Sequence, residues 1–313
     1  QKGLNFFETK SFVSLVEKLI ELKMLVPLLY NENDELASCQ KVYLMGPTIN
    51  MAYLILTDYC NLRCRYCFVE QDNSTDYRFS YMSSDVVRKS LDLFVRWTSE
   101  SKSRNKTVIF YGGEPLLNKE SFCAALKYIA ILKKKRLLPE ELQVSIITNG
   151  TLIDENTAHL MRDYNVLVGL SIDGMPKTHN EYRCFPGGIG SFNAIEKGYE
   201  ILSGAGVDIS ISLTITPSNV KNLLRHVKWV IKRFEPKGLG LNLLMDSAGK
   251  IISSPEYAEI AVKQMIRCFE FLRSKGIYEN RMMRKVEAFA QKRIYPHDCG
   301  GCGRQIVFLP SGK

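Results

Sequence analysis

Short β-branched and apolar runs alternate with amphipathic stretches along most of this chain, and this alternation is the strongest constraint on its fold. We expect strands at residues 51–57, 107–111, 143–148, 166–172, 207–216 and 239–245. We expect helices at residues 84–98, 119–135, 154–163, 191–203, 218–234 and 255–275. Strands that alternate with helices predict a parallel sheet. Six units are two fewer than a closed eight-fold barrel needs, so the sequence predicts an α/β fold with an open, partial (β/α)6 barrel of the TIM type.

Each expected strand is followed by a polar or glycine-rich motif. The motifs are, in order, "TDYCNLRCRYC", "YGGEP", "TNGT", "SIDG", "TITP" and "LLMD". The carboxyl ends of parallel strands meet at one edge of the sheet, where barrels of this type build their sites. The six motifs therefore predict one functional site at that edge.

The first motif places Cys60, Cys64 and Cys67 at the spacing C-x3-C-x2-C. A structural zinc site needs four ligands, usually in two separated pairs, and a disulfide uses two cysteines. Three thiolates suit a [4Fe-4S] cluster in which one iron stays open for another ligand. This spacing predicts such a cluster.

The other motifs offer groups that fit one ligand. Glu114 can offer a carboxylate to an ammonium group, and the glycines before it allow a close approach of the backbone. Ser171 and Asp173 share one face of an extended chain, and Asp173 can hold a ribose hydroxyl. Arg183 can hold a carboxylate with its planar fork. A ligand with an amine, a carboxylate and a ribose is S-adenosylmethionine (SAM), whose amine and carboxylate can chelate the open iron.

Over residues 52–245 the chain resembles radical SAM enzymes, by its three cysteines and by "GGEP". The resemblance implies that SAM is reduced at the cluster, with an external low-potential electron donor, to a 5′-deoxyadenosyl radical that abstracts a hydrogen atom. The resemblance implies that Tyr66 and Phe68 flank the adenine and that Gly113 and Glu114, beside Gly112, meet the SAM amine. It implies that Ser171 and Asp173 meet the ribose and that Arg183 meets the carboxylate. Thr148 and Asn149 have a looser role in the cofactor site.

The tail "DCGGCGRQIVFLPSGK" resembles the opening of a SPASM domain, whose cysteines bind auxiliary iron–sulfur clusters. We expect Cys299, Cys302 or both to be auxiliary ligands, with half a zinc site or a reactive pair as the alternative. The sequence stops at Lys313, before a further cysteine, so we expect it to be a fragment with an incomplete SPASM domain.

The stretch "SIDGMPKTHNEYRCFPGGIGSFN" resembles SPASM enzymes that modify peptides and proteins. We expect a peptide maturase that installs a thioether or carbon–carbon cross-link in a precursor peptide. The alternative is an anaerobic sulfatase-maturating enzyme that makes formylglycine from Ser or Cys, for which Asp246 is a candidate base, or else a helix cap or surface carboxylate. A non-catalytic metal-binding scaffold is the alternative of another class, which intact "GGEP", Asp173 and Arg183 argue against. We expect His179 and Asn180 to serve local structure.

The stretch "FVSLVEKLIELKMLVP" predicts an amphipathic helix that Pro27 ends. It is either a remnant of a peptide-recognition domain that continued before Gln1 or a helix packed on the barrel. We expect four segments: an N-terminal helical segment at residues 1–48, a radical SAM barrel at 49–250, linking helices at 251–298 and the start of a SPASM domain at 299–313.

The chain has 313 residues, nine cysteines and a formal net charge of +9. The charge fits a solvated surface or an acidic partner such as a leader peptide, and no motif indicates nucleic-acid binding. No apolar run reaches the roughly 18 residues of a spanning helix, so we expect no membrane partner. Clustered cysteines indicate metal chemistry in a reducing, cytoplasmic and oxygen-protected setting.

Overall fold

This computed structural model describes residues 10–21, 25–27, 33, 37, 49–67, 79–99, 105–244, 255–290 and 303–313. The chain divides into two compact units, of which the first holds Gln1–Pro47 and Lys285–Asp298. The second holds Thr48–Arg284 and Cys299–Lys313. In the first unit the expected N-terminal helix is α1 (Lys10–Glu21), which ends before Pro27.

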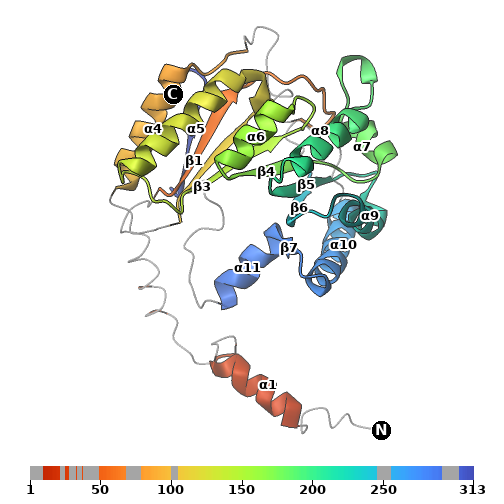
Figure 1. Ribbon diagram of the computed structural model, residues 1–313. Helices are drawn as coiled ribbons and strands as arrows, with labels where there is room; N and C mark the ends of the chain where they lie inside the picture. Colours follow the sequence, from red (N-terminus) through yellow and green to blue (C-terminus); the bar gives the residue numbers. More distant parts are fainter. Residues whose placement is uncertain are drawn as a thin grey trace, which may run out of the picture. The chain divides into compact units, whose positions relative to one another are not determined.

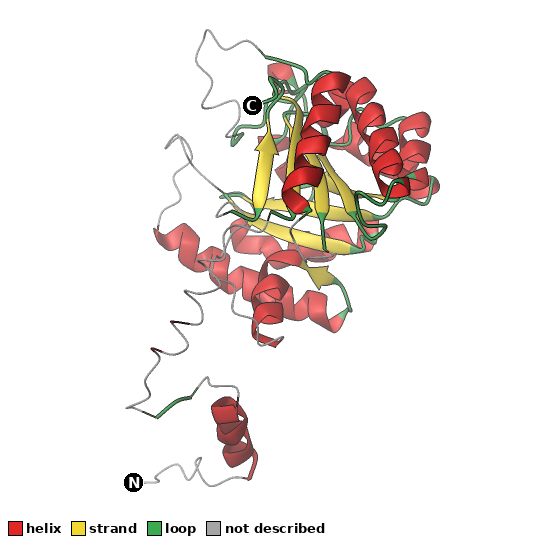
Figure 2. Cartoon of the chain, turned by 90° about the vertical axis from the view of Figure 1, so that its left-hand side faces the viewer, coloured by secondary structure: helices red, strands yellow, loops and turns green. Residues whose placement is uncertain are grey.

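A parallel eight-stranded sheet forms the second unit, in the order β7-β6-β5-β4-β3-β2-β1-β8 (Figure 1). Its strands are β1 (Met51–Thr57), β2 (Thr107–Gly112), β3 (Gln143–Thr148), β4 (Val166–Ser171), β5 (Ile209–Ile215), β6 (Gly238–Leu243), β7 (Tyr278–Glu279) and β8 (Gln305–Phe308). Strands β1 to β6 confirm the six that the sequence predicts, and the two edge strands were not predicted. The direction of the strands rotates across the sheet (Figure 2), as the twist of β-sheets requires.

Helices follow most of the strands, and α4, α5, α6 and α8 lie along one face of the sheet (Figure 1). The helices of the barrel and its C-terminal side are α4 (Ser84–Thr98), α5 (Lys119–Lys134), α6 (Glu155–Asp163), α7 (Pro176–Tyr182), α8 (Phe192–Gly204), α9 (Leu223–Phe234), α10 (Pro255–Ser274) and α11 (Asn280–Ala290). Three short 3-10 helices are η2 (Pro115–Asn118), η3 (Pro186–Gly188) and η4 (Val220–Asn222). Helix α7 was not predicted, and the predicted helix 218–234 is divided into η4 and α9.

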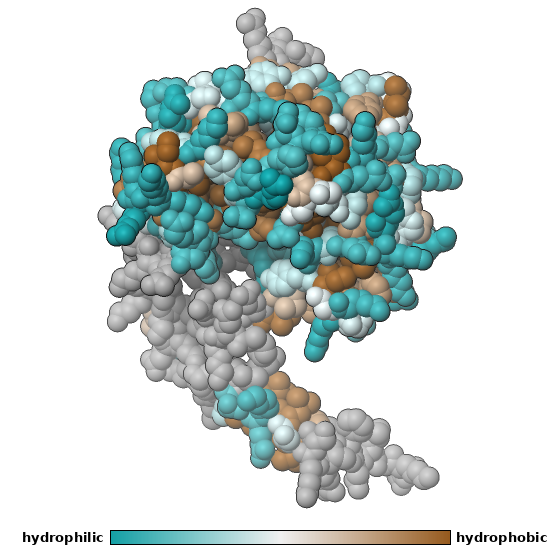
Figure 3. Space-filling view, viewed as in Figure 1, coloured by the Kyte–Doolittle hydropathy of each residue, from teal (hydrophilic) through white to brown (hydrophobic). Residues whose placement is uncertain are grey.

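The core lies between the sheet and its helices. Along β1, Ala52, Leu54 and Leu56 are fully buried, whereas the residues between them are half-buried on the other face. Phe110 of β2 packs edge-on against Phe122 of α5, with ring centroids 4.9 Å apart. Each such fully buried side chain contributes about 1.5–3 kcal/mol to folding. The opposite, outward face of the helices is mostly hydrophilic (Figure 3).

Asn118 links three segments near the edge that carries the motifs. Its Oδ1 accepts from the Ser121 amide at the start of α5. Its Nδ2 donates to the Leu56 carbonyl at 2.9 Å and to the Met82 carbonyl at 2.8 Å. One buried side chain thereby fixes the start of α5 against the end of β1.

On the C-terminal side, residues 303–313 add β8 to the sheet beside β1. Helix α10, expected in a linking segment, packs on α9 within the same unit as the barrel. Whether a further domain begins at residue 299 stays a prediction, because Cys299 and Cys302 lie outside the described residues. Within the described part of the chain, no helix combines the length and the apolar character that crossing a membrane requires.

Helix α8 approaches the "TNG" turn through a glycine. A Cβ on Gly198 would lie 2.1 Å from the Gly150 carbonyl oxygen, whereas a Cβ on Gly204, in the same helix, meets nothing within 4 Å. We predict that Gly198→Ala destabilises the protein by about 1–3 kcal/mol, because backbone must move. Gly204→Ala is the matched control and should be neutral or stabilising by up to about 1 kcal/mol. Urea unfolding measures both, and equal effects of the two variants would contradict the close approach.

Candidate functional site

The cysteine loop, residues 58–67, follows β1 and is anchored to the end of α7. The Arg63 amide donates to the Cys184 carbonyl at 2.7 Å, and the Arg65 amide donates to the Tyr182 carbonyl at 2.9 Å. The Arg63 guanidinium turns back and donates to the Cys60 carbonyl at 2.7 Å. The loop is therefore fixed both to a neighbouring segment and to itself.

The three thiols of this loop lie within electrostatic range of one another. Burial raises the pKa of Cys60 to about 11 and that of Cys64 to about 12. The Cys60 Sγ accepts from the Leu62 amide at 3.4 Å and from Asn149 Nδ2 at 3.8 Å. Iron binding must therefore displace protons from buried thiols.

The donor set fits an iron–sulfur cluster better than a zinc ion. A structural zinc needs four ligands around one point. Among the described residues, no three His, Cys, Asp or Glu side chains converge on one metal-ion position. A [4Fe-4S] cluster instead takes one thiolate at each of several irons, and Cys60, Cys64 and Cys67 supply three.

The two glycines of "YGGEP" lie against the end of β1 and the start of the cysteine loop. Gly112 has a φ of +132°, and a Cβ there would lie 2.2 Å from the Thr57 carbonyl oxygen. A Cβ on Gly113 would lie 2.2 Å from the Tyr59 carbonyl oxygen. The glycines therefore permit the close approach of two backbone segments, whereas the sequence had suggested the approach of a ligand.

Glu114 is 1% exposed, and its carboxylate is held inside the protein. It accepts from the Thr148 hydroxyl at 2.7 Å, the Asn149 amide at 2.8 Å and the Leu116 amide at 3.1 Å. Burial raises its pKa, and these hydrogen bonds act in the opposite direction. Glu114 thereby joins "GGEP" to "TNG". The expected contact of Glu114 with the SAM amine stays a prediction.

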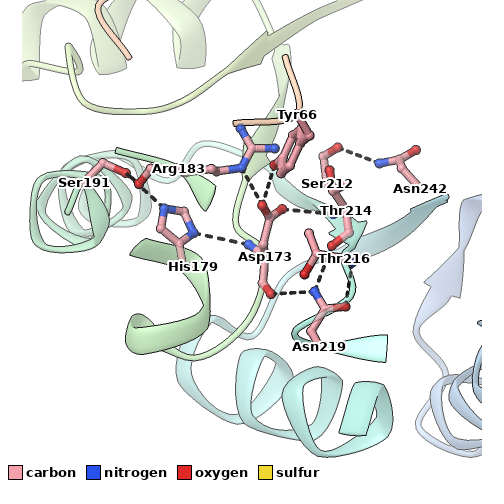
Figure 4. A network of polar contacts seen from close by, with 10 residues as sticks. All are labelled: Tyr66, Asp173, His179, Arg183, Ser191, Ser212, Thr214, Thr216, Asn219 and Asn242. Atoms are coloured by element: carbon pink, nitrogen blue, oxygen red, sulfur yellow. Dashed lines mark hydrogen bonds and ion pairs between the residues drawn. The ribbon is translucent and has the colours of Figure 1, made fainter. Parts of the chain in front are cut away.

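Asp173 is the centre of a buried network (Figure 4) and has no exposed surface. Its Oδ2 accepts from Arg183 Nε at 2.9 Å and from the Tyr66 hydroxyl, and its Oδ1 accepts from the Thr214 amide at 2.9 Å. The expected ribose contact of Asp173 stays a prediction. Burial acts to lower the pKa of Arg183, but the Asp173 carboxylate prevails and raises it. The carboxylate therefore holds a charged guanidinium in place.

Tyr66 joins this network to the cysteine loop. Its ring stacks on Tyr182 with centroids 5.9 Å apart, and the Arg183 guanidinium carbon lies 5.3 Å from its centroid. These contacts orient Tyr66 and Arg183 together beside Cys64 and Cys67.

A second chain of hydrogen bonds holds the backbone of Arg183. The Asp173 amide donates to His179 Nδ1 at 3.2 Å, so Nε2 carries the ring proton and donates to Ser191 Oγ at 3.1 Å. Ser191 Oγ donates to the Arg183 carbonyl at 2.9 Å. Burial lowers the pKa of His179 from 6.5 to about 4, which keeps the ring neutral near pH 7. The network agrees with the expected structural role of His179.

Sequence reasoning missed the part that Asn219 plays in this network. Its Nδ2 donates to the Asp173 carbonyl at 3.1 Å and to the Thr214 carbonyl at 2.9 Å. The signal was the Pro and Asn that follow "TIT", which mark a turn with a side-chain cap.

Of the predicted site residues, Ser171 is 6% exposed at the end of β4. Phe68, Asp246, Cys299 and Cys302 lie outside the described residues.

A comparison with known protein families shows to which family the chain belongs. The profile of the radical SAM superfamily matches residues 54–230, more than half of the chain. The chain belongs to the radical SAM superfamily. The matched segment contains the cysteine loop, "GGEP", Asp173 and Arg183. Radical SAM membership implies a [4Fe-4S] cluster and SAM, and the resemblance seen in the sequence is confirmed.

Curated relatives include sulfatase-maturating enzymes of two types. The cysteine-type anaerobic enzyme of Clostridium novyi is 33% identical over 178 residues, which are 56% of this chain and 45% of that protein. The serine-type anaerobic enzyme of Bacteroides thetaiotaomicron is 31% identical over 166 residues, which are 52% of this chain and 38% of that protein. The chain thus spans less than half the length of these relatives.

Solved structures share the radical SAM fold. The chain matches the anaerobic sulfatase-maturating enzyme anSMEcpe with bound AdoMet at a TM-score of 0.69 and 23% identity, covering 83% of this chain and 72% of that one. It matches Streptococcus suis SuiB bound to S-adenosylmethionine at a TM-score of 0.60 and 16% identity, covering 96% and 69%. At these identities the likeness concerns the fold alone.

We predict that Asp173→Asn destabilises the metal-free protein by about 3 kcal/mol or more, because it leaves the Arg183 guanidinium without its buried partner. Asp163→Asn is the control, since Asp163 forms an exposed ion pair with Arg162 at 2.7 Å. The control should cost less than about 1 kcal/mol. Urea unfolding measures both variants, and a loss for Asp173→Asn no larger than that of the control would refute the network.

The buried His179 also predicts a dependence of stability on pH. Its pKa is about 4 when folded, against 6.5 in the unfolded chain, so only the unfolded chain takes up its proton between these values. The free energy of unfolding should therefore fall by about 1.4 kcal/mol per pH unit from pH 6.5 towards pH 4 through this group. His179→Asn should remove this contribution, and His159→Asn, at an exposed histidine, should retain it. Equal pH profiles for wild type and His179→Asn would contradict the burial.

Proposed function

We propose that this chain is the catalytic barrel of a radical SAM enzyme that modifies a side chain of a peptide or protein. The observation that carries the proposal is the loop of Cys60, Cys64 and Cys67, anchored beside the buried pair of Asp173 and Arg183. A [4Fe-4S] cluster held there would supply one electron, from an external low-potential donor, for splitting SAM into methionine and a 5′-deoxyadenosyl radical that takes a hydrogen atom from the substrate.

The chain's own residues have distinct tasks in this proposal. Arg183 turns its Nε to Asp173, and the rest of its fork is left for the SAM carboxylate. Asn149 donates towards the Cys60 sulfur, and hydrogen bonds to sulfur tune the potential of a cluster. Ser171, at the end of β4, is our candidate for the ribose, and Tyr66 is our candidate for one side of the adenine.

The form of the sheet supports a peptide substrate. Its two edges are β7 and β8, which are not paired with one another, so the described strands do not close a barrel. Half-buried polar residues lie on the face away from the helices, where a peptide backbone could find hydrogen-bonding partners: Ser145, Ser210, Ser212, Thr214 and Asn242. An open sheet with a polar inner wall suits an extended chain better than a small apolar ligand.

Cross-link formation is the first candidate reaction. After loss of one hydrogen atom to the adenosyl radical, the substrate must give up one more electron and a proton while a thioether or carbon–carbon bond forms. An auxiliary cluster in the complete protein, with Cys299 or Cys302 as ligands, would accept that electron. Formylglycine formation is the second candidate, which the sulfatase-maturating relatives favour. It has the same electron balance. A serine substrate becomes the aldehyde directly, whereas a cysteine substrate becomes a thioaldehyde that water hydrolyses to the aldehyde and hydrogen sulfide.

We predict that the full-length protein, reconstituted anaerobically with iron and sulfide and reduced with dithionite, releases 5′-deoxyadenosine from SAM. Cys64→Ala should abolish the release, because the cluster loses a ligand. Cys123→Ala should retain it, since Cys123 lies on helix α5 outside the cysteine loop. Liquid chromatography measures the product. Iron binding without 5′-deoxyadenosine would support the non-catalytic scaffold and sink the proposal.

The same reaction can separate the two candidate products. A synthetic peptide from a sulfatase active site, with its cysteine or a serine in that place, is incubated with the active protein. Formylglycine reacts with a hydrazide probe, and a cross-linked peptide does not. A hydrazide adduct with 5′-deoxyadenosine release would establish the second candidate and contradict the first.

A further inference from the structure

A basic pocket lies between η4, α9 and α10, on the helical side of the sheet. It is an open depression of about 380 Å³, and its lining includes Leu224, Gln264 and four cationic side chains, Lys221, Arg225, Lys228 and Arg267. Among the described residues, no acidic side chain lines it. Four like charges around one hollow repel one another, and an anion in the pocket would relieve that repulsion.

The pocket cations differ from other cations on the same two helices. Arg233, near the end of α9, pairs with Glu196 at 2.9 Å and with Glu200 at 3.2 Å. Lys263 of α10 pairs with Glu259 at 2.5 Å. Among the residues that the structure describes, no ion pair neutralises the four pocket cations. Their charge is therefore available to a partner.

Two contacts hold the walls of the pocket in place. Gln264 Nε2 of α10 donates to the Lys221 carbonyl of η4 at 3.2 Å, which joins the two walls. The Lys228 ammonium lies 5.3 Å from the centroid of the Phe271 ring, a cation–π contact that orients it. A cationic side chain that is already held in place loses less conformational entropy when it binds an anion.

The cations are arranged in a row. Arg225 and Lys228 are three residues apart and share one face of α9, and Lys221 lines the same pocket from η4, about one turn earlier, so the three cations are spread over roughly 10 Å. Carboxylates two residues apart in an extended peptide are about 7 Å apart. A row of this length fits several carboxylates along a chain better than it fits one phosphate group.

In sequence, one wall of the pocket directly follows a residue of the candidate site. Helix η4 begins at Val220, directly after Asn219, whose side chain donates to the Asp173 carbonyl at 3.1 Å. We propose that this pocket binds an acidic segment of the peptide substrate, outside the barrel, while another part of that peptide reaches the cysteine loop. This inference rests on the proposed function for its substrate.

A direct binding experiment tests the pocket without catalysis. The probe is a fluorescein-labelled peptide of alternating Glu and Ser, titrated with the full-length protein at low salt and followed by fluorescence anisotropy. Arg225→Gln/Arg267→Gln should weaken binding roughly tenfold or more. Lys134→Gln/Lys135→Gln, which removes the same charge at the exposed end of α5, should weaken it less than about twofold. A peptide with Gln in place of Glu should not bind.

Three results would overturn the inference: equal weakening by both double variants, binding of the Gln peptide, or displacement of the Glu peptide by inorganic phosphate at equal charge concentration. Thermal unfolding of each variant excludes a loss of fold, and Arg225→Gln alone replaces the double variant if the double variant unfolds.

The assay for 5′-deoxyadenosine separates the pocket proposal from the proposed function. If the wild-type protein cleaves SAM but does not bind the Glu peptide, the pocket proposal alone fails. If it binds the peptide but releases no 5′-deoxyadenosine, the proposed function alone fails.

Discussion

The buried carboxylate of Asp173 is the interaction on which the rest of the candidate site depends. A charge without exposed surface is costly unless it is paired and hydrogen-bonded. Here donors from three parts of the chain meet it: the Tyr66 hydroxyl, the Arg183 side chain and the Thr214 amide. Because one carboxylate serves all three, the cysteine loop, the segment after α7 and strand β5 share a common anchor.

The close approach of backbone segments is the second constraint. Gly112 and Gly113 allow the end of β2 to touch the cysteine loop, and Glu114 then ties this turn to Thr148 and Asn149. Asn149 in turn reaches the Cys60 sulfur. The environment of the first thiol is thus set by residues far from it in sequence, which explains why three cysteines in one loop need the other strand ends to form a site.

Much of the fold could be predicted from the sequence because strand and helix patterns repeat and because motifs follow every strand. The two-residue β7 has too little pattern to be recognised, and β8 forms only because β1 offers an open edge. The site was predicted in its residues but only partly in their roles. Glu114 and Asp173 were identified by motif, whereas a sequence does not tell which neighbours satisfy a buried carboxylate, so their hydrogen-bond partners could not be predicted. Asn219 was missed because its partners lie in other motifs.

The central claim is that three cysteines hold a cluster whose remaining iron faces a SAM site beside Arg183. The most direct test is the electron paramagnetic resonance spectrum of the reduced, anaerobically reconstituted protein, recorded with and without SAM. The account predicts the spectrum of a reduced [4Fe-4S] cluster that changes when SAM is added, because SAM coordinates the open iron. A [4Fe-4S] spectrum that SAM leaves unchanged would contradict it.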